Sequence, residues 1–423
     1  MQSLATILLV IVLAAPQAAP QGGPPPIEQG KIDAAIKKGV EYLKGAAPGL
    51  QKPDDKNNRT ERELVLWTMV HADVPETDPV FATLLKDMLD RQLEATYCVA
   101  LQAMILEELG RVKYQRRIWQ CAQFLVDNQC TNGMWSYGTP TLFANDVPSE
   151  GGGRADVSSG GGEKKPGVRE FSTGRVKQEV KSKMKVEPKR TGPASGDNSN
   201  TQYAALGMRA CHDAGIIIPP AVIDKAMAWY RQCQKAAEGP AERLDIKDSL
   251  DKISAPAGQS GVMEVISAPP RGWCYGQHEH PAYGSMSAGS VGGLAIWDYI
   301  KDDDNGKKKR SWRKDKNVLE GIAWLAKHFS VMYNPGPYEH GNGENNSQHQ
   351  YYYYLYALER AGMLYGTETM GIHWWYPEGA KVLVEKQGGN GAWNGVADTC
   401  FAILFLKRAT TPLVATEGGS SRR

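Results

Sequence analysis

The chain alternates between two kinds of helical segment, and this alternation limits its fold more than any other feature. In both kinds, apolar residues recur at positions i, i+3, i+4 and i+7, which is the helical period. The first kind has one apolar face and one basic or polar face. Its members are residues 31–44, 81–93, 113–128, 221–234, 316–329 and 375–386. The second kind is apolar nearly all round and rich in small residues. Its members are residues 61–72, 96–110, 201–215, 286–300, 349–362 and 397–409.

A helix that is apolar on all sides must be buried, whereas an amphipathic helix covers a core from outside. Six of each kind in alternation therefore predict an all-α fold over residues 28–410, with six inner helices ringed by six outer ones. Small residues such as Ala204 and Gly289 allow the inner helices to approach closely. This arrangement is a closed α6/α6 toroid. An open helical solenoid has the same repeat, but we expect it to end in more polar caps.

Two long segments interrupt the helical pattern, and a short tail follows it. Residues 149–196 contain 11 Lys and Arg against 6 Asp and Glu, a local charge of +5 in a chain whose total is +2. Low hydrophobicity with many Gly, Ser, Lys and Pro residues predicts a disordered basic insertion over residues 141–198. Residues 238–271 are predicted to form a second, partly ordered loop. The tail, residues 411–423, is predicted to be disordered.

The N-terminus resembles a targeting segment. Residues 4–15 form an unbroken apolar run followed by small residues and Pro. About 12 residues are too few to span a bilayer but suit a secretory signal. We therefore expect residues 1–20 to be a signal peptide and the protein to be exported, to a periplasm or outside the cell. An uncleaved membrane anchor is the alternative.

Charge and cysteine content narrow the class of protein further. The 49 basic and 47 acidic residues nearly cancel, which argues against a dedicated nucleic-acid-binding protein. No segment after the signal is long and apolar enough to predict a transmembrane span. Seven cysteines are an odd number for an exported chain. Most lie among apolar helical neighbours, which favours packing in the core over disulfide formation. A disulfide such as Cys121–Cys130 is the alternative.

Two outer segments end in the same motif, Q-x-x-x-G-x-W. One copy contains Gln129, Gly133 and Trp135, and the other contains Gln387, Gly391 and Trp393. A degenerate copy, Gly272-Trp273, precedes the fourth inner segment. Glycine permits a turn with positive φ, tryptophan supplies a large packing face, and glutamine can bind helix ends. All three roles are structural.

The motif resembles the QW repeat of squalene and oxidosqualene cyclases, and the resemblance covers most of residues 28–410. These enzymes share an α/α toroid with the β subunits of protein prenyltransferases. The C-terminal half, from HQYYYYLYALERAG to ADTCFAILFLKRATTP, is similar to bacterial prenyltransferase/squalene-oxidase-repeat proteins of unestablished activity, which are the closer match. The resemblance implies the fold of the terpenoid cyclase/prenyltransferase superfamily.

The acid motifs of the cyclases are missing. Neither DxDD nor a DCTAE-like sequence occurs, and the Asp302–Asp304 cluster has the wrong spacing and lies in a Lys-rich segment. Resemblance to the prenyltransferases implies a zinc site at Asp398, Cys400 and His349. There the family's histidine follows its Asp-x-Cys pair, whereas His349 precedes it. The alternative is that Asp398 caps a helix, Cys400 packs in the core and His349 begins a helix. No cofactor is therefore predicted, and zinc stays an open possibility.

A second group of polar residues lies in the segments before the fourth and fifth inner helices. These segments, GQHEHPAYGS and YEHGNGENNSQHQ, include Glu279, Glu339 and Glu344 as candidate catalytic acids. Paired carboxylates at the rim of a toroid would suit a carbohydrate-active enzyme, because two acids flank the sugar bond in glycosidases. The alternative is that these are ordinary polar loops.

Taken together, these features predict an exported, squalene-cyclase-like toroid that does not cyclise. Its function is then to bind a small apolar ligand or a protein partner through the rim and the central cavity. The alternative is an enzyme, either a divergent terpenoid cyclase or prenyl transferase, or a carbohydrate-active α/α-toroid enzyme.

Overall fold

The computed structural model describes residues 24–51, 60–148, 177–248, 263–276, 280–304, 310–336, 348 and 350–413. Within these residues the chain is mostly helical, with 12 α-helices and 56% helical content. The all-α fold class is confirmed. The predicted signal peptide, residues 1–20, lies outside the described residues. Within those residues, no helix is long and apolar enough to cross a membrane.

Each segment of the first kind forms a helix close to its expected bounds. These helices are α1 (Gln29–Ala46), α3 (Pro79–Asp90), α5 (Gln115–Asp127), α7 (Pro220–Cys233), α10 (Lys316–Lys327) and α12 (Trp375–Lys386). They bury one face only. In α1, for example, Ile32, Ile36 and Leu43 are buried whereas the intervening lysines are exposed, as the amphipathic pattern requires.

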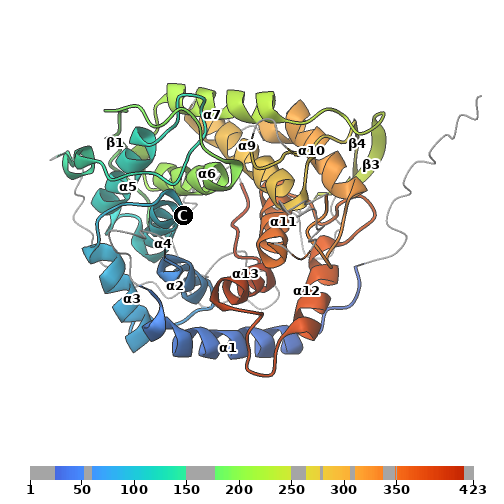
Figure 1. The fold of residues 1–423 in the computed structure, drawn as a ribbon, viewed down its shortest axis with the longest axis horizontal. Coiled ribbons are helices and arrows are strands. Elements are labelled where there is room, and N and C mark those ends of the chain that lie inside the picture. Colours follow the sequence, from blue (N-terminus) through green and yellow to red (C-terminus); the bar gives the residue numbers. More distant parts are fainter. Residues whose placement is uncertain are drawn as a thin grey trace, which may run out of the picture.

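Each segment of the second kind is also helical. These helices are α2 (Arg62–His71), α4 (Thr96–Gly110), α6 (Asn198–Asp213), α9 (Gly284–Asp304), α11 (Tyr351–Tyr365) and α13 (Val396–Lys407). They are buried on nearly all sides, and in α11 all 15 residues are buried. Each packs against the next in this order, and α13 packs against α2, so the contacts return to their starting point (Figure 1).

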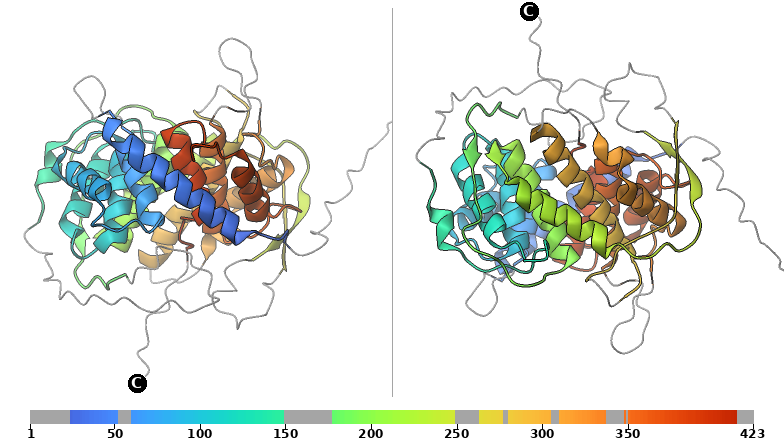
Figure 2. Two further views of the ribbon diagram at one scale, coloured as in Figure 1. Left: turned by 90° about the horizontal axis from the view of Figure 1, so that it is seen from below. Right: turned by 90° about the horizontal axis from the view of Figure 1, so that it is seen from above.

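The other set of helices lies outside these six. Helix α5 packs against α4 and α6, α10 packs against α9, and α12 packs against α11 and α13. Helix α1 covers α13, which joins the two ends of the helical series. The side views place α1 and α7 on opposite outer sides of the molecule (Figure 2).

The predicted disorder of residues 141–198 is wrong at both ends of that range. Residues 142–145 form a 3₁₀ helix, η2 (Leu142–Asn145), and residues 182–189 follow the surface of α5 through hydrogen bonds to its side chains. Strand β1 (Met184–Lys185) pairs in parallel with β2 (Ile216–Ile217). Arg190 fastens this segment through hydrogen bonds to Asn128 and to the Thr139 carbonyl. Specific contacts with α5 thus offset the polar composition, and residues 149–176 lie outside the described residues.

Residues 238–271 contain more regular structure than a loop. Strands β3 (Glu242–Lys247) and β4 (Met263–Ala268) pair antiparallel. Leu244, Ile246 and Ile266 turn inward and are buried, which is the alternation of a half-buried sheet. This apolar–polar alternation is short, and Gly, Ser and Pro residues separate the two strands. The sequence therefore did not reveal them. The remaining short helices are η1 (Ala47–Gly49) and η3 (Ser311–Lys314).

The predicted disordered tail is also wrong at its first residues. Leu413 is fully buried, and Arg209 donates hydrogen bonds to the carbonyls of Thr411 and Pro412. Arg209 lies on α6, far away in sequence, so the order of residues 411–413 depends on tertiary contacts. Residues 414–423 lie outside the described residues.

Candidate functional site

The two Q-x-x-x-G-x-W motifs adopt the same geometry. Gln129 Nε2 donates to the carbonyls of Gly133, at 3.3 Å, and Val222, at 2.9 Å. Gln387 Nε2 donates to those of Gly391, at 2.9 Å, and Ala35, at 2.8 Å. In each copy the second acceptor belongs to the next outer helix. Each glutamine therefore ties one outer helix to its successor, α5 to α7 and α12 to α1.

The glycine and tryptophan of each motif fix the turn between an outer and an inner helix. Gly133 has φ +95° and Gly391 has φ +87°, a region that favours glycine. The indole of Trp135 donates to Leu125 O and that of Trp393 donates to Leu383 O, both at 2.8 Å. Both rings are buried. The motifs thus position the first turns of the inner helices α6 and α13.

A third glutamine completes the degenerate copy and was missed in the sequence. Gln234, directly after α7, donates to the carbonyls of Arg271 and Asn317, both at 3.0 Å. Trp273 donates from its indole to Tyr230 O at 2.7 Å. This repeats the geometry of the intact motifs, with β3 and β4 inserted between the glutamine and the tryptophan. The detectable signal was a glutamine at the end of an outer helix, the same position that Gln387 occupies.

The first turns of all six inner helices surround one cavity of about 510 Å³. Its lining includes seven aromatic rings together with small polar side chains. The residues are Thr60, Glu61, Leu64, Tyr97, Leu101, Tyr137, Ser199, Asn200, Tyr203, Tyr275, Tyr283, Ser285, Met286, Gln350, Tyr353, Ala397 and Phe401. A concave, largely aromatic cavity of this size with a few polar groups is typical of small-molecule sites.

The aromatic rings form a mouth and a floor. At the mouth, Tyr137 and Tyr275 are exposed by 42% and 39%, and their hydroxyls lie 3.4 Å apart. At the floor, the ring of Tyr353 is stacked on that of Tyr203, with centroids 6.4 Å apart, and its centroid lies 5.4 Å from that of Phe401. These three floor residues are buried. Of the four consecutive tyrosines, only Tyr353 lines the cavity, because successive side chains point about 100° apart on a helix.

Helix caps hold the polar part of the wall in place. Asp197 caps α6 by accepting from the Asn200 amide at 2.7 Å, and the Asn200 side chain donates to its other carboxylate oxygen. Burial raises the pKa of Asp197. Thr60 accepts from the Arg62 amide at the start of α2. Such caps satisfy N–H groups that the first turn leaves unpaired.

Glu61 is the only carboxylate among the described lining residues. Part of its surface is exposed to solvent. The burial of the rest, together with the nearby charge of Asp398, raises its pKa. Burial likewise raises the pKa of Asp398, which accepts a hydrogen bond from Asn394 at 3.1 Å. Asp398 does not cap α13. The solvent-exposed carboxyl of Glu61 therefore differs from the dry, strongly acidic group that is needed to protonate an alkene.

The predicted zinc residues receive no support from the structure. Among the residues described, no three His, Cys, Asp or Glu side chains are grouped to hold a metal ion. Cys400 is fully buried and does not line the cavity, and burial raises the pKa of its thiol, whereas a metal ligand must be a thiolate. His349 lies outside the described residues, as do the candidate acids Glu279, Glu339 and Glu344. Of the segments that carry them, Tyr283, Ser285 and Gln350 line the cavity.

All seven cysteines are free and buried. The possible disulfide between Cys121 and Cys130 is therefore absent from these described residues. Burial raises the pKa of Cys121 to about 12 and that of Cys130 to about 11. The cysteines serve as small apolar core residues, the packing alternative raised from the sequence.

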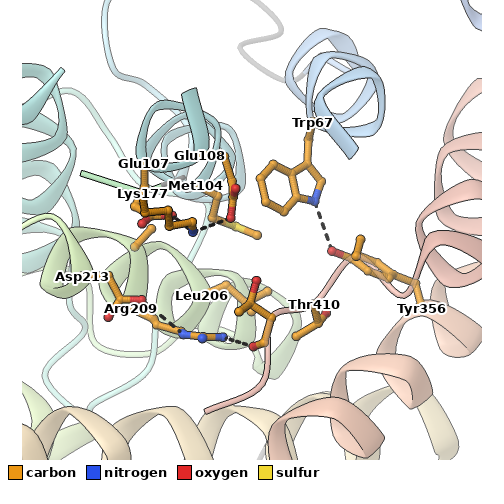
Figure 3. A pocket seen from close by; sticks show the side chains of 13 residues that line it. Trp67, Met104, Glu107, Glu108, Lys177, Leu206, Arg209, Asp213, Tyr356 and Thr410 are labelled. Atoms are coloured by element: carbon orange, nitrogen blue, oxygen red, sulfur yellow. Dashed lines mark hydrogen bonds and ion pairs between the residues drawn. The ribbon is translucent and has the colours of Figure 1, made fainter. Parts of the chain in front are cut away.

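The opposite end of the inner helices is closed by charged residues and by the chain after α13. A pocket of only about 50 Å³ lies there. Lys177 lies between the carboxylates of Glu107 and Glu108, at 2.6 and 2.5 Å, and Arg209 reaches Thr411 (Figure 3). Trp67 donates to the Tyr356 hydroxyl at 3.2 Å. The larger cavity thus opens at the N-terminal ends of the inner helices, while the C-terminal ends are packed.

Comparison with known proteins gives no further guide to function. No protein-family model matches the chain, and no curated protein matches it significantly. The cavity and the motif geometry are therefore the features that bear on function.

Proposed function

We propose that this protein is an α/α toroid of the terpenoid cyclase/prenyltransferase type that binds a small ligand in its central cavity without cyclising it. The closed order of inner-helix contacts and the three glutamine–tryptophan turns support this fold. We propose further that the N-terminal segment directs export, or anchors the chain to a membrane.

The observation that carries the binding proposal is the cavity built from the first turns of all six inner helices. Its volume suits a molecule of drug size, since ligand pockets range from about 300 to 1,000 Å³. Catalysis by alkene protonation is disfavoured because the DxDD and DCTAE motifs are missing and because Glu61, the one carboxylate among the lining residues that the structure describes, is exposed.

The proposal is tested with Prodan, an uncharged aromatic ketone whose emission responds to its surroundings. Ala397 lies in the cavity wall, so Ala397→Trp should fill part of the cavity and weaken Prodan binding at least tenfold. Ala82 is exposed on the outer helix α3, so Ala82→Trp serves as the matched control and should bind as the wild type does. Equal binding by wild type and Ala397→Trp, or no binding at all, would contradict a ligand-binding cavity.

The enzymatic alternatives predict products. Purified protein is incubated separately with squalene, with farnesyl diphosphate plus a peptide acceptor, and with soluble polysaccharide. We expect each substrate to be recovered unchanged. A cyclised terpene, a prenylated peptide or new reducing ends would replace the binding proposal with the corresponding enzyme.

A further inference from the structure

A buried arginine lies beneath the floor of the cavity. Arg360, on α11, is only 2% exposed, and its Cζ lies 4.2 Å from the centroid of the Tyr356 ring. Its Nη2 donates to Gln202 Oε1 at 2.7 Å. Its Nη1 has no hydrogen-bond partner within the described part of the chain. A guanidinium has only donors, so this group projects positive charge toward the floor without a full set of acceptors.

Gln202 carries the effect of Arg360 to the cavity wall. Because its Oε1 accepts from the guanidinium, its Nε2 faces the other way and donates to the hydroxyl of Tyr353. Gly289 on α9 makes room for this amide, since a Cβ there would lie 2.2 Å from Gln202 Oε1. The orientation of the amide is thus fixed from both sides.

The hydroxyl of Tyr353 must then donate its own proton elsewhere. Its oxygen already accepts from Gln202, and the neighbouring group is Ser199 Oγ at 3.0 Å. Tyr353 and Ser199 both line the cavity, whereas Gln202 and Arg360 do not. The floor therefore presents hydroxyl groups that a buried cation polarises through an amide, which strengthens them as donors.

The charges around the cavity favour an electron-rich but uncharged partner. The first turns of six helices bring partial positive charge to the cavity, and Arg360 adds to it. Yet the described lining contains no Lys, Arg or His side chain, and its one carboxylic acid is Glu61. An anionic head such as a diphosphate would find no cation in direct contact there.

We infer that Tyr353 and Ser199 form a polar subsite that binds a carbonyl, ether or hydroxyl oxygen of an uncharged ligand, whose apolar body lies against Tyr203 and Phe401. This inference rests on the proposed function, because it requires that the cavity hold a ligand. It makes Tyr353 the residue that decides between oxygenated ligands and plain hydrocarbons, with Gln202 and Arg360 as positioning residues.

Prodan also tests the subsite, because its ketone accepts a hydrogen bond and its emission shifts to shorter wavelength when that bond is lost. Tyr353→Phe keeps the ring but removes the donor, so Kd should rise about five- to tenfold with a blue shift of the bound emission. Tyr42→Phe removes a hydroxyl on the outer helix α1, where Tyr42 is partly exposed and does not line the cavity. It is the matched control, with Kd expected within about twofold of wild type.

Gln202→Glu provides a second variant that retains the Tyr353 hydroxyl. A carboxylate accepts and does not donate, so Tyr353 should donate to it instead of to the ketone, and the same blue shift should follow. Unchanged Kd and emission in both Tyr353→Phe and Gln202→Glu would overturn the subsite while leaving the binding cavity intact. Absence of Prodan binding by the wild type would instead overturn the proposed function and the subsite with it.

Discussion

Gln387 donates from Nε2 to the carbonyl oxygen of Ala35, 2.8 Å away and 352 residues earlier in the chain. This bond joins the last outer helix, α12, to the first, α1, and so links the two ends of the helical series. Gln129 and Gln234 make the equivalent bonds from α5 to α7 and from α7 to α10. One residue type therefore joins successive outer helices at three places.

Replacing Gln387 with alanine should lower the free energy of unfolding by about 1–2 kcal/mol, because the carbonyls of Ala35 and Gly391 lose their shared donor. Urea denaturation followed by circular dichroism measures this change. Gln29→Ala, which removes an exposed glutamine from α1, is the control and should change little. Equal stability of the two variants would show that the joint between α12 and α1 contributes nothing.

The turn glycines should tolerate no side chain. A Cβ at Gly391 would lie 2.6 Å from the Lys38 carbonyl, at a residue with φ +87°. We expect Gly391→Ala to cost about 2 kcal/mol or more, from backbone strain and from the displaced helix α1. Gly389 has no atom within 4 Å of such a Cβ, so Gly389→Ala should be nearly neutral. The thermal unfolding midpoints of the two variants are compared, and similar midpoints would contradict the predicted clash at Gly391.

Lys177 should stabilise the closed end of the inner helices. Its ammonium contacts both Glu107 and Glu108, and burial raises the pKa of Glu107. Lys177→Met leaves two buried carboxylates without this shared cation, so we expect a loss of about 2–4 kcal/mol at pH 7. Adding Glu108→Gln should restore part of the loss. Lys189→Met removes a lysine that is about half exposed, and an equal effect there would argue against a specific role for Lys177.

Glu359 should make stability depend on pH. Burial raises its pKa to about 7, although it accepts hydrogen bonds from the amide and hydroxyl of Thr410 and lies beside Arg360. Since its pKa is higher in the folded than in the unfolded state, its contribution is full below about pH 4.5 and is lost as pH rises through 7.

The size of this effect is on the order of 3 kcal/mol between pH 4.5 and pH 7.5. It is measured as the difference in unfolding free energy between wild type and Glu359→Gln, which cannot ionise. This difference should favour the wild type more at the lower pH. A difference that stays constant across the range would mean that the pKa of Glu359 is the same in the folded and unfolded states.

The seven thiols should be unreactive in the native protein. All are buried, and neutral, buried thiols react slowly because the thiolate is the nucleophile. We expect dithionitrobenzoate to label almost none of them under native conditions and all seven after unfolding in guanidinium without reductant. A count of five or fewer after unfolding would reveal a disulfide.

The sequence alone determined the helices and their two kinds, because burial on one side or on all sides leaves a local period in the chain. It also determined the two intact turns, since Gln387, Gly391 and Trp393 lie within one short segment. The glutamine of the third turn escaped detection because Gln234 and Trp273 are separated by β3 and β4, whose pairing is non-local.

Only the tertiary structure decided what surrounds the cavity. No local pattern distinguishes Tyr353, which lines the floor, from Tyr354, which is buried against the Ser330 carbonyl. The hydrogen bonds from Arg360 to Gln202 and from Gln202 to Tyr353 run from α11 to α6 and back to α11. Such a series depends on how helices far apart in sequence pack together, and this packing is fixed by the whole ring of contacts rather than by any one segment.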